Sequence, residues 1–208
     1  MDAPPANRLG ILGGTFNPVH VGHLILAQDA CDLFDLPGLL FVPCAQPPHK
    51  PATALLPAEH RLAMLELAVQ DDPRFEVCSL ELDRGGVSYT IDTARALRAR
   101  HPDAELCLVI GSDSLAELPQ WRDVRPLLEL VRVVTLARPG FDPDALAALD
   151  RRLPPPWPER LRRDVRVGHA VAIASSDIRH RLSEGMSARY LVPDAVAMYI
   201  AEHHLYTA

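Results

Sequence analysis

Residues 8–34 read RLGILGGTFNPVHVGHLILAQDACDLF, and this stretch predicts three successive elements. Residues 8–13 form a short apolar run that ends in glycine, which is typical of a buried strand. Residues 20–34 carry apolar side chains at helical spacing. Between them, Gly-Gly and Asn-Pro interrupt regular structure. The stretch therefore predicts a strand, a sharp loop and a helix in direct succession.

The chain then repeats this alternation for about 140 residues in all. We expect further strands and helices, in the order 38–43 (strand), 59–70 (helix), 74–82 (strand), 88–100 (helix), 104–111 (strand), 122–130 (helix) and 131–137 (strand). Strands that alternate with helices indicate a parallel sheet with helices on both faces. We therefore predict an α/β fold, a Rossmann-like doubly wound parallel sheet with a small helical C-terminal part.

The length of 208 residues suits one compact domain. Within it we expect a Rossmann-like core over 8–149 and a C-terminal part over 167–208. Residues 150–166, DRRLPPPWPERLRRDVR, are rich in proline and arginine and are expected to be an insertion or loop; an arginine patch that meets a phosphate or a partner is the alternative. In the C-terminal part, Ser175 or Ser176 is expected to cap a helix, and residues 191–206 to form the final one.

Composition narrows the class of protein. The net charge of -6 argues mildly against a large nucleic-acid surface. No apolar run approaches the roughly 20 residues of a membrane span, and the N-terminus lacks a signal pattern, so the cytoplasm is the expected location. The four cysteines form no CxxC pair and are expected to be structural thiols.

Polar and glycine residues follow the predicted strands. These residues are Gly13-Gly14-Thr15, Pro43-Cys44, Gly111-Ser112-Asp113 and Arg138-Pro139. Ligands of parallel α/β sheets bind at the carboxyl ends of the strands. This edge is therefore the expected binding edge.

The segment GGTFNPVHVGH has the features of an anion site. Neither GxGxxG nor GxxxxGK[ST] is present, which disfavours a dinucleotide dehydrogenase and a P-loop protein. The glycines allow backbone N–H groups to approach an anion, and the helix that follows directs its positive end to the same place. His20 and His23 can both donate hydrogen bonds there, and phosphates would raise their pKa. Two histidines three residues apart behind this turn indicate function.

SSDIR, at 175–179, predicts a second anion site, because a serine-bearing helix start is followed one turn later by Arg179. Together the two motifs predict a polyphosphate held from two sides. Phosphoryl or nucleotidyl transfer needs no activated serine or cysteine. A phosphate monoester is largely dianionic at pH 7, since its second pKa is about 6, and attacks without a base. The protein then supplies positioning and charge neutralisation.

The motifs, taken in order, resemble a known enzyme family. GGTFNPVHVGHL is similar to the (H/T)xGH signature of the nucleotidyltransferase superfamily, and SSDIR is similar to its SSTxIR signature. PPHK, ELDRGGVSYTIDT, GSDSLAELPQW, RPG and the tail LVPDAVAMYI resemble bacterial nicotinate-nucleotide adenylyltransferases. The resemblance runs from residue 9 to about residue 206 and implies that residues 1–208 are one nucleotidyltransferase domain.

The resemblance implies adenylyl transfer from ATP to nicotinate mononucleotide, which gives deamido-NAD and pyrophosphate in NAD biosynthesis. The mononucleotide phosphate would attack the α-phosphorus in line, without a covalent enzyme intermediate. Mg²⁺ would arrive with ATP, and no protein metal ligands are implied. The expected partners are the two substrates, with no nucleic acid and no membrane. The oligomeric state is left open, a homo-oligomer included.

The resemblance also implies roles for matching residues. His20, His23 and Arg179 would be catalytic. The implied ATP-binding residues are His20, His23, Arg179, Gly13, Gly14, Thr15, Phe16, Gly111, Asp113, Arg138, Ser175, Ser176 and Ile178. The implied mononucleotide-binding residues are Thr15, His49, Lys50, Thr90, Thr93 and Trp121. Trp121 would stack on the pyridine ring.

Several of these residues also have a purely structural interpretation. Trp121 or Phe16 could fill the core, Asp113 could cap a helix, and Arg138 could lie in a solvated turn. Thr90 and Thr93 could likewise be an N-cap and a helix-face residue.

The chain departs from the family pattern in three places. Asp177 stands where the second signature has threonine, and a carboxylate repels a triphosphate unless it points away or meets Mg²⁺. Arg122 follows Trp121 where an aromatic residue is common, and residues 150–166 have no counterpart. The alternatives are an adenylyltransferase for nicotinamide mononucleotide or another phosphate acceptor, and a non-catalytic nucleotide-binding regulator.

Overall fold

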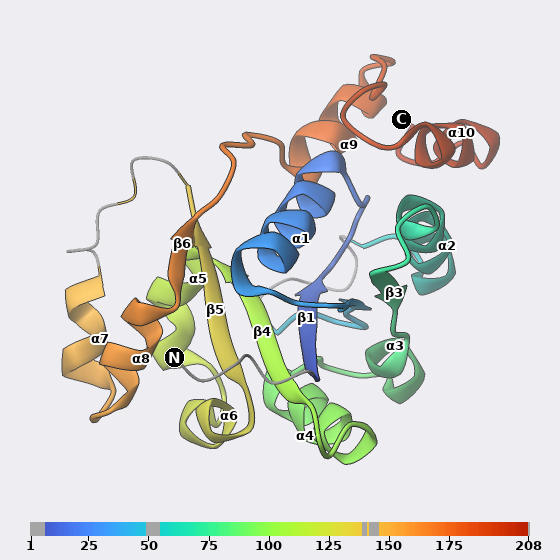
Figure 1. Cartoon of the computed structure of the whole chain (residues 1–208). Helices are drawn as coiled ribbons and strands as arrows, with labels where there is room; N and C mark the ends of the chain where they lie inside the picture. Colours follow the sequence, from blue (N-terminus) through green and yellow to red (C-terminus); the bar gives the residue numbers. More distant parts are fainter. Residues whose placement is uncertain (1–6, 49–54, 139–140, 142–145, 208) are drawn as a thin grey trace. The chain divides into compact units, whose positions relative to one another are not determined.

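The computed structural model describes residues 7–48, 55–138, 141 and 146–207 (Figure 1). A six-stranded sheet has the order β3-β2-β1-β4-β5-β6. Its strands are β1 (Arg8–Gly14), β2 (Leu39–Pro43), β3 (Phe75–Val77), β4 (Glu105–Gly111), β5 (Arg132–Ala137) and β6 (Val165–Val167). The pairs β1–β4, β4–β5 and β5–β6 are all parallel. The predicted α/β fold with a parallel sheet is confirmed.

The helices follow the predicted alternation. They are α1 (Val21–Phe34), α2 (Ala58–Val69), α3 (Leu80–Arg84), α4 (Thr90–Arg100), α5 (Ser112–Glu117), the 3-10 helix η2 (Leu118–Gln120), α6 (Val124–Leu130), α7 (Ala147–Arg152), α8 (Trp157–Arg163), α9 (Ser175–Ser183) and α10 (Asp194–Glu202). No helix in the described ranges combines the length and the apolar character needed to cross a membrane.

The described residues fall into two compact units. Unit 1 is drawn from Met1–Leu12, Leu26–Leu39 and Tyr89–Ala170. Unit 2 is drawn from Gly13–Ile25, Leu40–Ser88 and Val171–Ala208. That residues 1–208 form one domain stays a prediction.

The core of unit 1 lies around β4 and β5, which run side by side in Figure 1. Residues Leu106–Ile110 of β4 are all buried. Such a continuous apolar run is characteristic of a parallel strand covered on both faces. Leu108 pairs with Val133 in register, and Gly111 with Leu136. Both strands therefore end at the same edge of the sheet.

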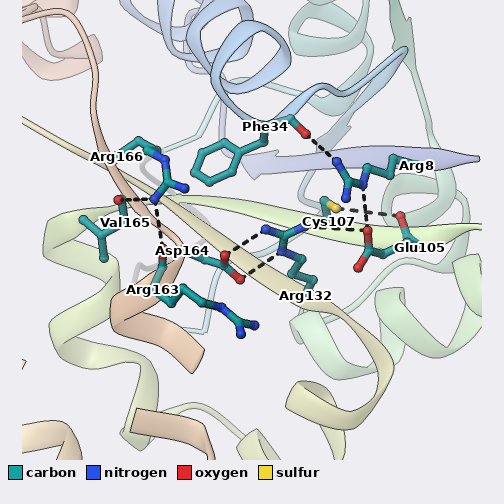
Figure 2. A network of polar contacts seen from close by, with 9 residues as sticks. All are labelled: Arg8, Phe34, Glu105, Cys107, Arg132, Arg163, Asp164, Val165 and Arg166. Carbon is teal, nitrogen blue, oxygen red and sulfur yellow. Dashed lines mark hydrogen bonds and ion pairs between the residues drawn. The ribbon is translucent and has the colours of Figure 1, made fainter. Parts of the chain in front are cut away.

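The loop prediction for residues 150–166 is wrong. This segment contains the end of α7, α8 and most of β6. Pro156 and Pro158 stand at the start of α8, where a helix tolerates proline. Asp164 is 4% exposed and accepts two hydrogen bonds from Arg132, at 2.9 and 2.8 Å (Figure 2). The segment is thus built into the sheet of unit 1.

The amino ends of the strands of unit 1 carry a charged network (Figure 2). Arg8 donates to Glu105 at 2.8 Å, and Arg132 lies 3.7 Å from the same carboxylate. Arg166 lies over the ring of Phe34 at 5.6 Å. The charges of Glu105, Arg132, Arg8 and Asp164 act on the buried Cys107 thiol, and burial raises its pKa to about 12. All four cysteines are free in this structure, and three of them are buried, in agreement with structural thiols.

The strand predicted over 74–82 is also partly wrong. β3 ends at Val77, and α3 begins at Leu80. The Ser79 hydroxyl donates to Asp83 at 2.8 Å across the new helical turn. Gly85 ends that turn with a φ of +67°, which a residue with a side chain rarely adopts. This local polar pairing explains why the chain leaves the strand early.

Candidate active site

The loop of residues 15–20, between β1 and α1, is the centre of the candidate site in unit 2. Phe16 and Asn17 are 0% and 1% exposed. The Phe16 ring lies edge-on to His23, with centroids 5.0 Å apart, and 5.8 Å from Phe41. Phe16 therefore supports His23 from within the core, as its structural interpretation expected. A role of Phe16 in nucleotide binding stays a prediction.

His20 and His23 stack on each other with ring centroids 3.7 Å apart. The backbone N–H of His20 donates to His23 Nδ1 at 3.2 Å. Because Nδ1 is the acceptor, the ring hydrogen of neutral His23 lies on Nε2. His20 Nδ1 is buried and has no hydrogen-bond partner within the part of the chain that the structure describes.

Both histidines are uncharged at neutral pH. Burial lowers the pKa of His20 to about 4. Burial, followed by the charge of His20, lowers the pKa of His23 to about 3. The pair thus offers neutral hydrogen-bond donors, and a nearby polyphosphate would favour protonation.

Gly22 is required by the packing of this pair. A Cβ at Gly22 would lie 3.0 Å from Nδ1 and 3.1 Å from Cε1 of His20. A Cβ at Gly14 would likewise lie 3.0 Å from the Phe16 ring, whereas one at Gly13 would meet nothing within 4 Å. The glycine inside the HVGH motif therefore leaves room for the first imidazole.

The SSDIR motif lies against the same loop. Ser175 donates its hydroxyl to Pro18 O at 2.9 Å, and Arg179 donates to Asn17 O at 2.8 Å. The prediction that Ser175 or Ser176 caps the helix is wrong, because Ala174 is the N-cap residue and no side chain caps α9. The two predicted anion motifs thus meet within unit 2.

The remaining residues of α9 differ in exposure. Ile178 is fully buried. Ser176 and Asp177 are exposed, and the Ser176 hydroxyl donates to Asp177 Oδ1 at 3.2 Å. The unexpected carboxylate is therefore paired locally and lies at the surface of unit 2.

Unit 1 carries the predicted residues that follow β4 and β5. Gly111 is the N-cap residue of α5, and a Cβ there would meet nothing within 4 Å. Asp113 is exposed on the first turn of α5 and makes no cap hydrogen bond, so its structural interpretation as a cap is wrong. Arg138 is exposed directly after β5.

The predicted mononucleotide residues in unit 1 lie at α4 and just after η2. Thr90 begins α4 and Thr93 is buried within it. The Arg122 guanidinium lies over the Tyr89 ring at 4.4 Å, which ties the segment after Trp121 to the start of α4. Trp121 itself is half-buried. His49 and Lys50 lie outside the described residues.

Sequence reasoning missed several residues that hold the loop of residues 15–20. Arg61 donates to Thr15 O at 2.9 Å, and Tyr206 donates to Asn17 Oδ1 at 2.8 Å. Asn17 Oδ1 also accepts from the Leu56 N–H at 3.3 Å. Arg61 stands three and four residues before two buried apolar residues of α2, a spacing that places it on the buried face. That periodicity could have identified it.

No group of three His, Cys, Asp or Glu side chains suited to a metal ion occurs within the described ranges. Unit 1 has a cavity of about 510 Å³ at the amino ends of β4 and β5. Arg132 and Asp164 in its wall pair with each other. Its wall includes none of the predicted site residues.

Known proteins resemble this chain in both sequence and fold. The sequence pattern of the cytidylyltransferase-like family matches residues 11–181. A probable nicotinate-nucleotide adenylyltransferase of Symbiobacterium thermophilum is 47% identical over 96% of this chain and 95% of its own. A probable nicotinate-nucleotide adenylyltransferase of Herpetosiphon aurantiacus is 45% identical over 97% of this chain and 99% of its own. The solved structure of Plasmodium falciparum nicotinic acid mononucleotide adenylyltransferase complexed with NaAD has a TM-score of 0.73 at 16% identity, over 96% and 97% of the two chains.

Proposed function

This chain belongs to the cytidylyltransferase-like family and, within it, to the nicotinate-nucleotide adenylyltransferases, and from that premise we propose that it transfers the adenylyl group of ATP to nicotinate mononucleotide. The products are deamido-NAD and pyrophosphate. The observation that carries the proposal is the meeting of the HVGH and SSDIR motifs at the loop of residues 15–20. The chain has His20, Gly22 and His23 of the first motif. It has Ser175, Ser176, Ile178 and Arg179 of the second, and the Asp177 side chain between them is exposed.

The chemistry needs positioning and charge more than proton transfer. An oxygen of the mononucleotide phosphate forms a bond to the α-phosphorus of ATP. The bond from the α-phosphorus to the oxygen bridging to the β-phosphate breaks, and pyrophosphate leaves with that electron pair. The attacking phosphate is largely dianionic at pH 7, so no general base is required.

The residues of unit 2 fit the phosphate side of this reaction. His23 has its ring hydrogen on Nε2, where it can donate to a phosphate oxygen. Arg179 holds Asn17 O with one terminal nitrogen and brings a permanent charge to the loop. We assign both residues, with His20, to the stabilisation of charge on the phosphates as the bond to pyrophosphate breaks.

Mg²⁺ enters this proposal as part of the substrate MgATP. Asp113 is proposed for a ribose hydroxyl, and Trp121 for the pyridine ring.

The direct test is pyrophosphate release from MgATP, with nicotinate and nicotinamide mononucleotides compared side by side. We expect release that depends on mononucleotide and is much faster with the acid. Equal rates would show that the enzyme takes both, and attention would move to Trp121 and Arg122. A complete lack of release with either acceptor would contradict the proposed function and favour a nucleotide-binding regulator.

A further inference from the structure

Arg61 is a buried arginine that the proposed reaction does not use. It lies on α2 and is 1% exposed. None of the ion pairs found in the described residues includes it. An arginine stays charged in a protein, and removing that charge from water without a partner is costly. The groups that stabilise the buried charge of Arg61 therefore have to be identified.

Backbone carbonyls hold the guanidinium in place. Nε donates to Leu56 O at 3.1 Å. One terminal nitrogen donates to both Thr15 O and Cys44 O, at 2.9 and 2.8 Å. The second terminal nitrogen lies 3.5 Å from Ala45 O. Arg61 therefore joins the start of the loop of residues 15–20 to the segment that follows β2 and to Leu56, two residues before α2.

A backbone hydrogen bond strengthens the same junction. The Cys44 N–H donates to Gly14 O at 2.9 Å, next to the carbonyl groups that Arg61 holds. Phe16 and Asn17, which follow Thr15, are fully buried or nearly so. The position of the histidine motif thus depends on a junction that has Arg61 at its centre.

The positive charge of Arg61 acts electrostatically on Tyr206, a group that binds the loop of residues 15–20. Burial raises the pKa of Tyr206, whereas the charges of Arg179 and Arg61 lower it in part. The Tyr206 hydroxyl is the group that donates to Asn17 Oδ1. Carbonyl dipoles stabilise a guanidinium without neutralising it, so the positive charge of Arg61 persists beside the loop. Because His20 and His23 are uncharged at pH 7, Arg61 and Arg179 supply positive charge that the histidines lack.

Resting on the proposed function, we propose that Arg61 is a positioning residue for the triphosphate of ATP: it fixes the start of the loop of residues 15–20 and places a permanent positive charge next to it. Arg61 does not touch substrate, since it is buried and its donors are directed at carbonyl oxygens. Arg61 affects the triphosphate by fixing the position of the loop and by the electrostatic potential of its guanidinium. The ligand class is a nucleoside triphosphate.

Arg98 provides a matched control. It is also an arginine whose donors go to backbone carbonyls, among them Ala104 O at 2.6 Å and Leu130 O at 3.0 Å. It lies in unit 1, at α4, and no predicted site residue contacts it through these bonds. Arg61→Met and Arg98→Met each remove one guanidinium that binds carbonyls. Both are expected to lower the melting temperature.

The test measures MgATP binding by calorimetry at several salt concentrations, together with kcat and KM. Arg61→Met is expected to weaken MgATP binding about tenfold or more and to reduce its salt dependence, because one charge is lost. Arg98→Met is expected to bind MgATP like the wild type. Arg61→Lys keeps the charge but not the planar fork, so the salt dependence should persist while kcat falls.

The outcomes are distinguishable even if Arg61→Met does not fold, because Arg61→Lys then carries the test. Unchanged MgATP affinity and salt dependence in a folded Arg61→Met variant would overturn the proposal. So would wild-type kcat in Arg61→Lys. Wild-type protein that binds MgATP but releases no pyrophosphate would defeat the proposed function and leave the binding comparison intact.

Discussion

The phenolic hydroxyl of Tyr206 donates to Oδ1 of Asn17 at 2.8 Å, across 189 positions of the chain. Asn17 is almost fully buried, and its backbone carbonyl accepts from Arg179 at 2.8 Å. The C-terminal segment of unit 2 therefore helps to fix the loop that carries the first histidine. Although Tyr206 lies far from that loop in sequence, a change at Tyr206 is expected to alter the position of the loop.

Removing this hydroxyl should loosen the loop without emptying the space. Tyr206→Phe is expected to cost about 1 kcal/mol of unfolding free energy, because the hydrogen bond from the phenolic hydroxyl to Asn17 Oδ1 is lost. A fall in kcat should accompany it. Urea unfolding and steady-state kinetics measure the two effects. Wild-type values in both would show that the bond is dispensable.

The limited space at Gly22 predicts a packing defect centred on His20, with a second close contact at Val171 Cγ1, 3.2 Å from the added Cβ. In Gly22→Ala the new Cβ would lie 3.0 Å from His20 Nδ1, so the ring must move. We expect a stability loss of about 1–3 kcal/mol and a clear fall in kcat. Gly13→Ala, whose Cβ would meet nothing within 4 Å, is the control for stability. Equal melting temperatures for the two variants would refute the packing argument.

His23 is expected to contribute to turnover far more than to folding. His23→Ala removes the Nε2 donor and should lower kcat at least about a hundredfold, as does the loss of a strong transition-state contact. His60 on α2 offers a control histidine in the same unit, since its Nδ1 lies 3.0 Å from the Tyr199 hydroxyl. His60→Ala should retain turnover. Near-normal turnover in His23→Ala would contradict the assigned role.

The depressed pKa values of the histidines predict a loss of stability in acid. The values of about 4 and 3 lie below the ordinary 6.5, so the folded protein resists protonation at these sites. Their contribution is complete above pH 6.5 and is lost as the pH falls through the range down to the folded values. As the pH falls from 6.5 to 5, each histidine should lower the free energy of unfolding by up to about 2 kcal/mol. Urea unfolding of the wild type and of His23→Gln from pH 7.5 to pH 5 checks this: the wild type should lose more unfolding free energy over this range than the variant, and parallel pH profiles would contradict the prediction.

Much of the fold follows from hydrophobic pattern alone. The run from Leu106 to Ile110 predicted a central strand, and the helical spacing after His20 predicted α1. The junction of β3 and α3 did not follow, because the Ser79 and Asp83 pair decides it locally. Residues 150–166 were mistaken for a loop because prolines at a helix start look the same in sequence as prolines in a loop.

Those residues of the candidate site that belong to contiguous sequence motifs could be predicted. His20, His23 and Arg179 were identified from sequence, and the structure brings their segments together in unit 2. Arg61 and Tyr206 were missed because their partners are backbone or side-chain oxygens distant in sequence. Ser175 was expected to cap its own helix but binds a carbonyl 157 positions away. Such pairings depend on tertiary structure, and of these residues only Arg61 leaves a local signal, which is its place on the buried face of α2.

The bonds that hold the loop of residues 15–20 have a consequence for the order in which the protein is made. A ribosome completes this loop before its partners, because Ser175, Arg179 and Tyr206 are added 157, 162 and 189 positions after the residues they bind. A nascent chain therefore carries its first histidine motif without these three partners until it has been extended to them. A product truncated before Ser175 would bear the first signature motif without the hydrogen bonds that hold it in place.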